Sequence, residues 1–398
     1  MTAAASASPT ARLLMGSGPS NPDPRVLHAM AQDLLGQFDP AFTVIMEETQ
    51  AELRRLFQTR NRGTFPVSGT SRAGMEAAVV SLVEPGEVVL AVENGRFGRL
   101  FEEIARRAGA EVAVLRAPWG TPVDPVDVER ALARRRAAVV TLVHGETSTG
   151  TLNPVAEIAA VAHRHDALVV VDAVSTLGGA RLDVDGWDVD VCVAGCQKCL
   201  GCPSGLAPVT YSDGVARRMA KRGTLIRSNY LDLTQLERYW SPERLNHHTA
   251  PTTMVYGLRE ALRLVADEGL ETRIRRHEAA GQAMAAGLRA LGFLPFGPPP
   301  GPLKMPMLTP VLVPEGVDDA KGRARLLDEH GIEIMGAFGG LAGQVWRVGT
   351  MGYNARRAPV LRTLTALAAV LGPLPGGASI GEALLEADRY WETLAAAS

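Results

Sequence analysis

The chain has 398 residues, of which 46% are hydrophobic and 21% charged, and its formal net charge at pH 7 is −2. This length predicts two or three domains, and this composition is that of a globular chain, so wholesale disorder is excluded. The near balance of 41 basic and 43 acidic residues argues against a nucleic-acid-binding protein. No apolar run approaches the roughly 18 residues that a membrane-spanning helix needs, so we expect no membrane span.

Residues 1–20 are expected to form an N-terminal tail. The opening stretch MTAAASASPT has neither the basic n-region nor the apolar h-region of a secretory signal. We therefore expect a cytoplasmic protein.

Strand-length apolar runs alternate with helical patterns through the first two-thirds of the chain. The strand-like runs lie at 88–92, 137–145, 167–175 and 190–195, with amphipathic helical patterns at 99–110 and 154–167. Short apolar runs bounded by Gly, Pro or Asp are typical of strands buried on both faces of a parallel sheet. The alternation predicts a doubly wound α/β core from about residue 65 to about residue 245.

A smaller domain is expected at the C-terminal end. One long helical pattern covers 252–292, and the Gly/Pro cluster at 297–302 closes it. The segment 303–371 mixes strand-like and helix-like stretches, and 373–379 reads as a linker to a last helix. We predict a large domain over 21–280 and a small α+β domain over 281–398.

Four cysteines lie within eleven residues, at Cys192, Cys196, Cys199 and Cys202. Their spacing permits two interpretations. An iron–sulfur site would make the chain a redox protein, whereas buried cysteines lining a turn are typical of proteins in a reducing compartment. We favour the second interpretation because short cysteine spacings arise by chance and the flanking sequence is a buried strand that runs into a Gly/Pro turn.

Three segments that follow predicted strands could hold a charged ligand. The stretch Ser68-Gly69-Thr70-Ser71 opens a helix and Arg72 adds a positive charge, which predicts either an anion site or an ordinary N-cap. Asp172 directly follows an apolar run, so its carboxylate needs a partner. Lys198, one of only four lysines, lies one strand later in a Gly-rich turn. A phosphate turn, an aspartate and a lysine in this order predict pyridoxal phosphate, with Asp172 on the pyridinium and Lys198 as the imine.

Several longer motifs carry a resemblance to a known family. They are GPSNPDPRVL (18–27), GTSRAGMEA (69–77), VHGETSTGTLNP (143–154), VDAVS (171–175), QKCLG (197–201), LNHHT (245–249) and VWRVGTMGYNARR (345–357). The chain resembles the class V, fold-type I aminotransferases of the alanine/serine–glyoxylate group over nearly its whole length. The resemblance implies an α/β fold with a mostly parallel seven-stranded sheet flanked by helices, a smaller C-terminal α+β domain, and a homodimer with shared active sites.

The resemblance also implies roles for single residues. Lys198 corresponds to the catalytic lysine and Asp172 to the aspartate on the pyridine nitrogen. Arg347 corresponds to the arginine that clamps the substrate carboxylate. The remaining cofactor residues are Thr70, Ser71, Arg72, Phe97, Thr147, Val174, Gln197 and Thr249, with Phe97 at a stacking position where relatives often have tryptophan and Thr249 reaching the other subunit. No metal is expected. His247 and His248 are interpreted as structural hydrogen-bonding residues, and His144 is given no catalytic role.

Two carboxamides distinguish the chain from the alanine-using relatives. Asn246 stands where those relatives have tyrosine, and Gln37 stands where many plant-type relatives have histidine. A carboxamide offers a donor and an acceptor together, which complements a ureido group. On these residues the chain most resembles the (S)-ureidoglycine–glyoxylate aminotransferase branch, in which an amino group passes to glyoxylate to give glycine.

Other functions stay open at this point. Asn246 and Gln37 could be neutral changes in an alanine– or serine–glyoxylate aminotransferase, or the chain could be similar to pyridoxamine–pyruvate aminotransferase. A cysteine desulfurase would need a cysteine on a distal loop, whereas all four cysteines lie beside Lys198. A non-enzymatic cofactor-binding protein would require Lys198 to be silent.

Overall fold

A computed structural model describes residues 11–396, and its main feature is a seven-stranded sheet. The strand order is β2-β10-β9-β8-β5-β3-β4. The strands are β2 (Gly63–Ser68), β3 (Val88–Glu93), β4 (Glu111–Arg116), β5 (Val139–Val143), β8 (Leu168–Asp172), β9 (Val191–Val193) and β10 (Leu206–Tyr211). Strand β10 is antiparallel to β2 and β9, and the other neighbouring pairs are parallel. The predicted mostly parallel sheet is confirmed.

The four strand-like runs of the sequence form β3, β5, β8 and β9, which lie side by side inside the sheet. Their burial on both faces explains their continuous apolar character. The apolar sequence patterns of strands β2, β4 and β10 are weaker. The edge strand β4 is only half-buried, and β2, at the other edge, contains Pro66, which a sheet tolerates best at its edge.

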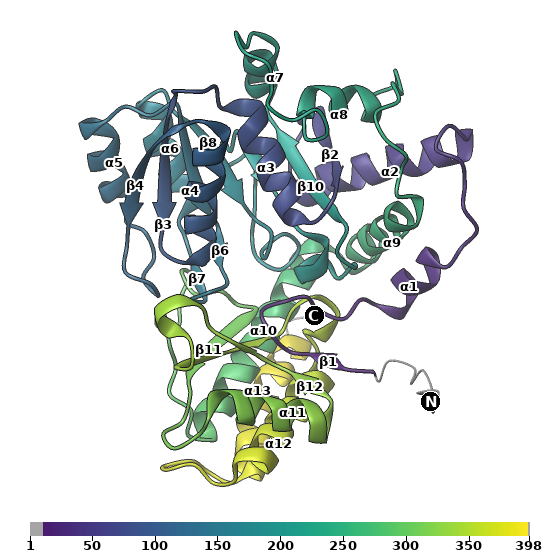
Figure 1. Cartoon of the computed structure of the whole chain (residues 1–398). Helices are drawn as coiled ribbons and strands as arrows, with labels where there is room; N and C mark the ends of the chain where they lie inside the picture. The colour runs from purple at the N-terminus through teal and green to yellow at the C-terminus, as the bar shows by residue number, and fades with distance from the viewer. Residues whose placement is uncertain (1–10, 397–398) are drawn as a thin grey trace, which may run out of the picture.

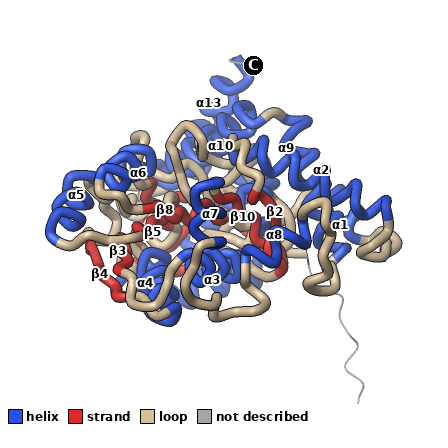
Figure 2. The backbone as a smooth tube through the Cα atoms, turned by 90° about the horizontal axis from the view of Figure 1, so that it is seen from above, coloured by secondary structure: helices blue, strands red, loops and turns tan. Residues whose placement is uncertain are grey.

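Helices cover both faces of the sheet, and Figure 2 shows α3 and α4 on one side of the strands and α5 and α6 on the other. Figure 1 shows α1, α2 and α9 beside the β2 end of the sheet. The helices of this part are α1 (Pro24–Met30), α2 (Pro40–Phe57), α3 (Ser71–Leu82), α4 (Arg96–Ala108), α5 (Pro125–Arg134), α6 (Val155–Arg164), α7 (Asp213–Ala220), α8 (Leu233–Trp240) and α9 (Thr252–Glu268). A short hairpin, β6 (Gly145–Glu146) and β7 (Thr151–Leu152), follows β5.

The single long helix expected over 252–292 is wrong. The chain forms two helices, α9 and α10 (Leu270–Ala290), which meet at Gly269. Gly269 has a φ of +80°, a conformation that glycine adopts without steric cost and that ends a right-handed helix. The apolar periodicity continues across this break, so the pattern alone did not reveal it.

The C-terminal part has a sheet and a hydrophobic core of its own, and it lies below the large sheet in Figure 1. Strand β14 (Val345–Gly349) pairs antiparallel with β11 (Leu308–Leu312) and with β13 (Met335–Gly336). The helices are α11 (Asp319–His330), α12 (Arg357–Leu371) and α13 (Ile380–Ala396), and α13 packs on α10. Within residues 11–396, no helix combines the length and the apolar character needed to cross a bilayer.

Residues 11–20 of the predicted N-terminal tail belong to the folded structure, and residues 1–10 lie outside the described part. Strand β1 (Leu13–Leu14) pairs in parallel with β12 (Ile332–Glu333) of the C-terminal part. Met15 is fully buried among the apolar side chains of that part. Residues with weak apolar signals are thus ordered by a partner more than 300 positions away, which no local pattern could indicate.

Candidate active site

The ends of two neighbouring strands bring Asp172 and Lys198 to the same edge of the large sheet. Asp172 is the last residue of β8, and it lies opposite Val193, the last residue of β9. The chain then turns through Gly195 into a short π-helical segment (Cys196–Leu200) that contains Lys198. Because carboxyl ends of parallel strands meet at one edge, this is the place where α/β folds bind ligands.

The amine of Lys198 is buried and held by the N-terminal segment. The side chain is 9% exposed, and Nζ donates a short hydrogen bond to the carbonyl of Ser17. A Cβ at Gly18 would lie 2.5 Å from Nζ, and Gly18 has a φ of +94°, so both the space and the backbone conformation favour glycine here. Burial, together with the positive charge of Arg347, lowers the pKa of Lys198 to about 8. The amine is therefore far closer to its neutral, nucleophilic form at neutral pH than an ordinary lysine.

The carboxyl group of Asp172 is buried with little to stabilise its charge. It is 4% exposed and accepts one hydrogen bond, from the backbone N–H of Val174 at 2.8 Å. The pKa of Asp172 is raised to about 7, because burial and the nearby carboxylate of Glu146 together outweigh the hydrogen bond from Val174 and the charge of Lys198, which lower it. A protonated ring nitrogen would give this carboxylate the charged partner that it lacks.

The start of helix α3 offers polar groups suited to a phosphate. Thr70 is its N-cap residue, but the Thr70 side chain makes no capping hydrogen bond. The amide nitrogen of Gln197 donates to Ser71 Oγ at 3.0 Å, which ties this helix start to the segment of Lys198. The side chains of Thr70 and Arg72 are exposed. Free backbone N–H groups at a helix start, with hydroxyls and an arginine, fit a phosphate group.

The β6–β7 hairpin brings Phe97 and Thr147 together through Glu146, which the sequence analysis did not single out. The Glu146 carboxylate is buried and accepts hydrogen bonds from the backbone N–H groups of Phe97 (2.9 Å) and Gly98 (3.2 Å). It also accepts from the hydroxyl of Ser148 at 2.6 Å. Burial raises the pKa of Glu146, and the hydrogen bonds oppose that rise. In the sequence, only the charge of Glu146 could have pointed to this role, because the rest of the motif VHGETSTGTLNP is neutral.

Arg347 is a buried cation without a carboxylate partner in the described part of the chain. It lies on β14, is 2% exposed, and its Nε and Nη2 donate to the carbonyl of Gly336 at 2.9 and 2.6 Å. Its Nη1 donates to the carbonyl of Thr147 at 3.1 Å, and the guanidinium lies 4.4 Å from the ring centre of Phe338. Burial lowers its pKa to about 10. Its hydrogen-bond acceptors are neutral carbonyl groups, which leave its positive charge uncompensated. The site therefore favours an anion.

The predicted carboxamides Gln37 and Asn246 contact each other. Gln37 Nε2 donates to Asn246 Oδ1 at 3.0 Å, and Gln37 Oε1 accepts from the N–H of Ala250 at 2.9 Å. The side chains of Asn246 and Thr249 are exposed, and Val174 is half-buried. Among residues 11–396, no hydrogen bond joins Gln37, Asn246 or Thr249 to Lys198 or Arg347. The structure thus forms two clusters of predicted site residues, one around Lys198 and one around Gln37.

The histidines have hydrogen-bonding roles. His248 Nε2 lies 2.6 Å from Ser68 Oγ, and the Nδ1 atoms of His247 and His248 are 2.8 Å apart. This supports the interpretation of the pair as structural, because it fixes the segment of Thr249 against the end of β2. His144 is buried, and its Nδ1 lies 2.9 Å from the hydroxyl of Thr176.

All four cysteines are buried and free. Burial raises the pKa of Cys199 to about 12 and that of Cys192 further, so both stay neutral thiols. In the described part of the chain, no three His, Cys, Asp or Glu side chains are grouped so that they could hold a metal ion. The iron–sulfur alternative therefore has no support in the structure.

The fold and this cluster of a buried lysine, a buried aspartate and a phosphate-type helix start define a pyridoxal-phosphate-dependent transferase. The chain belongs to the class V aminotransferases, whose family model matches residues 14–345 and whose members depend on pyridoxal phosphate. It is 48% identical to the (S)-ureidoglycine–glyoxylate transaminase of Bacillus subtilis (strain 168), over 96% of this chain and 95% of that one. It is 37% identical to the alanine–glyoxylate aminotransferase of Mus musculus, over 92% and 88% of the two chains.

A solved structure has the same fold as this chain. The crystal structure of the ureidoglycine–glyoxylate aminotransferase from Bacillus subtilis superposes with a TM-score of 0.94 at 49% identity, covering 98% of this chain and all of that one. The predicted fold class, enzyme class and cofactor are therefore confirmed.

Proposed function

We propose that this aminotransferase moves the amino group of (S)-ureidoglycine to glyoxylate, forming glycine. The observation that carries the choice of donor is the contact between Gln37 and Asn246. Gln37 uses its carbonyl and one N–H in the two recorded hydrogen bonds. Its second N–H and both N–H groups of Asn246 have no acceptor among residues 11–391, whose side chains the structure describes, so together they match the carbonyl oxygen of a ureido group. The 48% identity to a ureidoglycine–glyoxylate transaminase supports the same choice.

The residues of the Lys198 cluster have distinct tasks in this proposal. When bound, pyridoxal phosphate supplies an electron sink for the bond that is broken at the donor's α-carbon. Asp172 holds a proton on the ring nitrogen by staying ionised beside it. Thr70, Ser71 and Arg72, with Gln197, hold the phosphate.

Substrate handling falls to two further groups. Lys198 Nζ takes the proton from the donor's α-carbon, a task for which its lowered pKa suits it. The planar guanidinium of Arg347 holds the carboxylate of donor and acceptor alike, because both substrates carry one. Phe97 covers one face of the ring, Val174 packs on the other, and Thr147 lies near the ring hydroxyl or the substrate.

We also propose a homodimer in which Gln37, Asn246 and Thr249 complete the partner's site. Large apolar side chains flank these residues at the surface: Leu34 is 68% exposed, Phe38 64% and Leu245 41%. Contiguous exposed apolar side chains of this size mark an interface. Two subunits arranged this way would join the two clusters of site residues.

The division into a domain over 21–280 and one over 281–398 remains our proposal. It is supported by two large hydrophobic clusters, one drawn from residues 26–270 and the other mostly from residues 280–387.

A cytoplasmic location is proposed because the four cysteines are free, which suits a reducing compartment.

The donor is tested by comparing kcat/KM for ureidoglycine and alanine with glyoxylate as acceptor. Ureidoglycine is generated in the assay by coupled upstream enzymes, and glycine formation is followed. A site that hydrogen-bonds a polar group should favour ureidoglycine by at least about a hundredfold. Equal efficiency with alanine would contradict the proposal and favour a general alanine– or serine–glyoxylate aminotransferase.

A further inference from the structure

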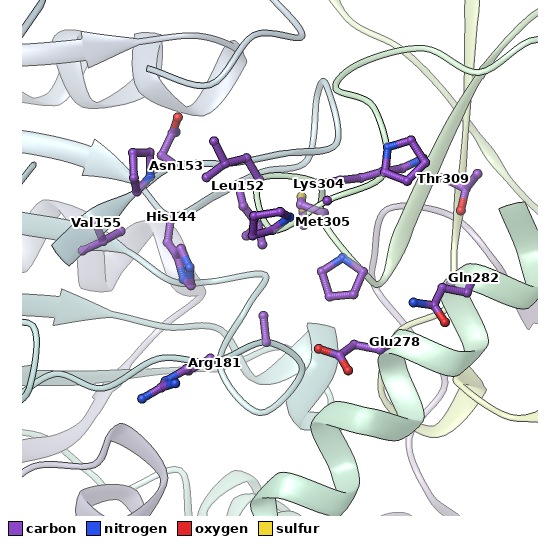
Figure 3. Close-up of a pocket in the computed structure, with 18 of the residues that line it drawn as sticks. His144, Leu152, Asn153, Val155, Arg181, Glu278, Gln282, Lys304, Met305 and Thr309 are labelled. Atoms are coloured by element: carbon purple, nitrogen blue, oxygen red, sulfur yellow. The ribbon is translucent and has the colours of Figure 1, made fainter. Parts of the chain in front are cut away.

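A cavity of about 960 Å³ lies between the large sheet's part of the molecule and helix α10. None of the residues assigned above to cofactor or substrate lines it. Figure 3 shows His144 and Leu152 on one side of this cavity and Glu278 and Gln282 of α10 on the other. Its volume lies within the range of about 300–1,000 Å³ that is typical of small-molecule sites.

Two cations line this cavity without a recorded counter-ion. Lys304 and Arg289 both line it, and neither has an ion pair with the side chains that the structure describes, those of residues 11–391. Lys304 is half-buried, and its pKa is lowered by burial and then by the positive charge of Arg289. By contrast the exposed Lys321 lies 4.0 Å from its partner carboxylate, on Asp318. Arg289 is exposed, and both positive charges face the same cavity, so an anion between them would be attracted by both.

Both cations stand on ordered stretches of backbone. Lys304 forms an antiparallel bridge with Thr151 of the β6–β7 hairpin, and its neighbours bond the same hairpin through Leu152 N–H to Leu303 O (2.8 Å) and Met305 N–H to Gly150 O (2.9 Å). Arg289 lies in the last turn of α10. The two charges therefore stand on two ordered segments, helix α10 and the stretch that pairs with the β6–β7 hairpin.

The rest of the lining mixes apolar and polar side chains, with one flat aromatic side chain and a small excess of positive charge. Leu152, Val155, Ala180 and Met305 line the cavity beside Trp187, whose ring lies 5.5 Å from that of His144. The charged side chains of the lining are three cations, Arg181, Arg289 and Lys304, against two carboxylates, Glu157 and Glu278. Such a lining suits a ligand with an apolar body and one anionic group.

We propose that this cavity binds an organic anion, whose carboxylate or phosphate lies between Lys304 and Arg289 and whose apolar body lies along Leu152 and Met305. The ligand would contact the β6–β7 hairpin on the side opposite its tip. That tip carries Thr147, whose carbonyl accepts from Arg347. The cavity is thus connected to the substrate-binding arginine through one short hairpin.

Binding is tested by isothermal titration calorimetry of the cofactor-loaded enzyme with phenyl phosphate. Lys304→Met and Arg289→Met should each weaken the Kd about tenfold or more, because each removes a charge-assisted hydrogen bond. Lys321→Met, a matched lysine outside the cavity, should bind as the wild type does. Arg289→Gln repeats the test with a polar replacement. Equal Kd values for the wild type and the cavity variants would overturn the proposal.

Three further probes identify the chemistry recognised. Benzoate competing better than phenyl phosphate would identify a carboxylate ligand, and the reverse order would identify a phosphate; either result supports the proposal. Benzyl alcohol binding as tightly as the two anions would overturn the role of charge. Inorganic phosphate binding as tightly as phenyl phosphate would overturn the role of an apolar body. These measurements need no turnover, so their outcome is independent of the proposed amino donor.

Discussion

The guanidinium of Arg347 donates a hydrogen bond to the main-chain carbonyl of Thr147 at 3.1 Å, across the boundary between the small sheet and the hairpin that follows β5. The two residues are 200 positions apart in sequence. Arg347 also lies near enough to Lys198 for its charge to lower the pKa of that amine.

Arg347→Lys should keep the positive charge but lose the planar fork. We expect kcat/KM for donor and acceptor to fall together, because both substrates would lose bidentate binding of their carboxylate. The fall should correspond to a loss of about 2–3 kcal/mol in transition-state stabilisation. Arg323→Lys is the matched control, since Arg323 is paired with Asp319 on the neighbouring helix α11. Steady-state kinetics with glyoxylate decide: a wild-type value in Arg347→Lys would place the carboxylate clamp elsewhere.

Lys198 should attach the cofactor with a pH dependence set by its lowered pKa. Only the neutral amine is a nucleophile, so the rate of recombination of the apoenzyme with pyridoxal phosphate should rise with pH and level off above about 8. With an ordinary lysine, the rate would continue to rise up to about pH 10.4. Stopped-flow absorbance measures this rate. A profile that keeps rising past pH 10 would contradict the lowered pKa.

The same lysine should carry the cofactor covalently after borohydride reduction. Lys198→Ala should release the cofactor on gel filtration and lose turnover, whereas Lys321→Ala should do neither. Peptide mapping of the reduced enzyme should find the modification on Lys198, and modification of another lysine would remove Lys198 from its assigned role.

Asp172→Asn should bind cofactor but transaminate poorly. The neutral amide cannot hold a proton on the ring nitrogen, and loss of a charge-assisted hydrogen bond worth about 1.5–3 kcal/mol corresponds to roughly a 10- to 150-fold loss in kcat. Asp190→Asn provides the comparison, because Asp190 is also a partly buried carboxylate but accepts from His163 and the N–H of Val169. If Asp172→Asn turned over at the wild-type rate, the carboxylate would not act on the ring.

Glu146→Ala should loosen the start of helix α4 and the position of Phe97. Removing the carboxylate leaves the buried N–H of Gly98 without its acceptor, so the free energy of unfolding should fall by about 1.5–3 kcal/mol. Cofactor affinity should fall as well, since Phe97 is the proposed stacking residue. Denaturant titration and a fluorescence Kd measure the two effects. Glu146→Gln, which keeps one acceptor oxygen, should lose less of both.

The double variant Gln37→His/Asn246→Tyr should lose ureidoglycine turnover and keep or gain alanine turnover. Both changes remove carboxamide groups, and the tyrosine fills the space that the ureido group would occupy. Cofactor content, measured by absorbance, should stay at the wild-type level, because no hydrogen bond joins these residues to the Lys198 cluster among residues 11–396. An unchanged ratio of the two donors would show that Gln37 and Asn246 do not select the donor.

The sequence was sufficient to predict the meeting of Asp172 and Lys198, because each follows a strand of the same parallel sheet and such strands end at one edge. It was not sufficient to predict the contact between Lys198 and Ser17, since residues 11–20 have no periodic signal and gain their order from a distant strand. Glu146 was missed because its role depends on backbone N–H groups of another helix. The break at Gly269 was missed because the apolar stripe continues through it.

The pairing of β1 with β12 has a consequence for how the protein is made. Leu13 and Leu14 leave the ribosome early, but their partners Ile332 and Glu333 are synthesised some 320 residues later, which at about 5–20 residues per second takes on the order of tens of seconds. Until then Ser17 has no anchored position from which to accept the hydrogen bond of Lys198. We therefore expect the segment of Leu13 and Ser17 to take its place beside Lys198 only near the end of translation.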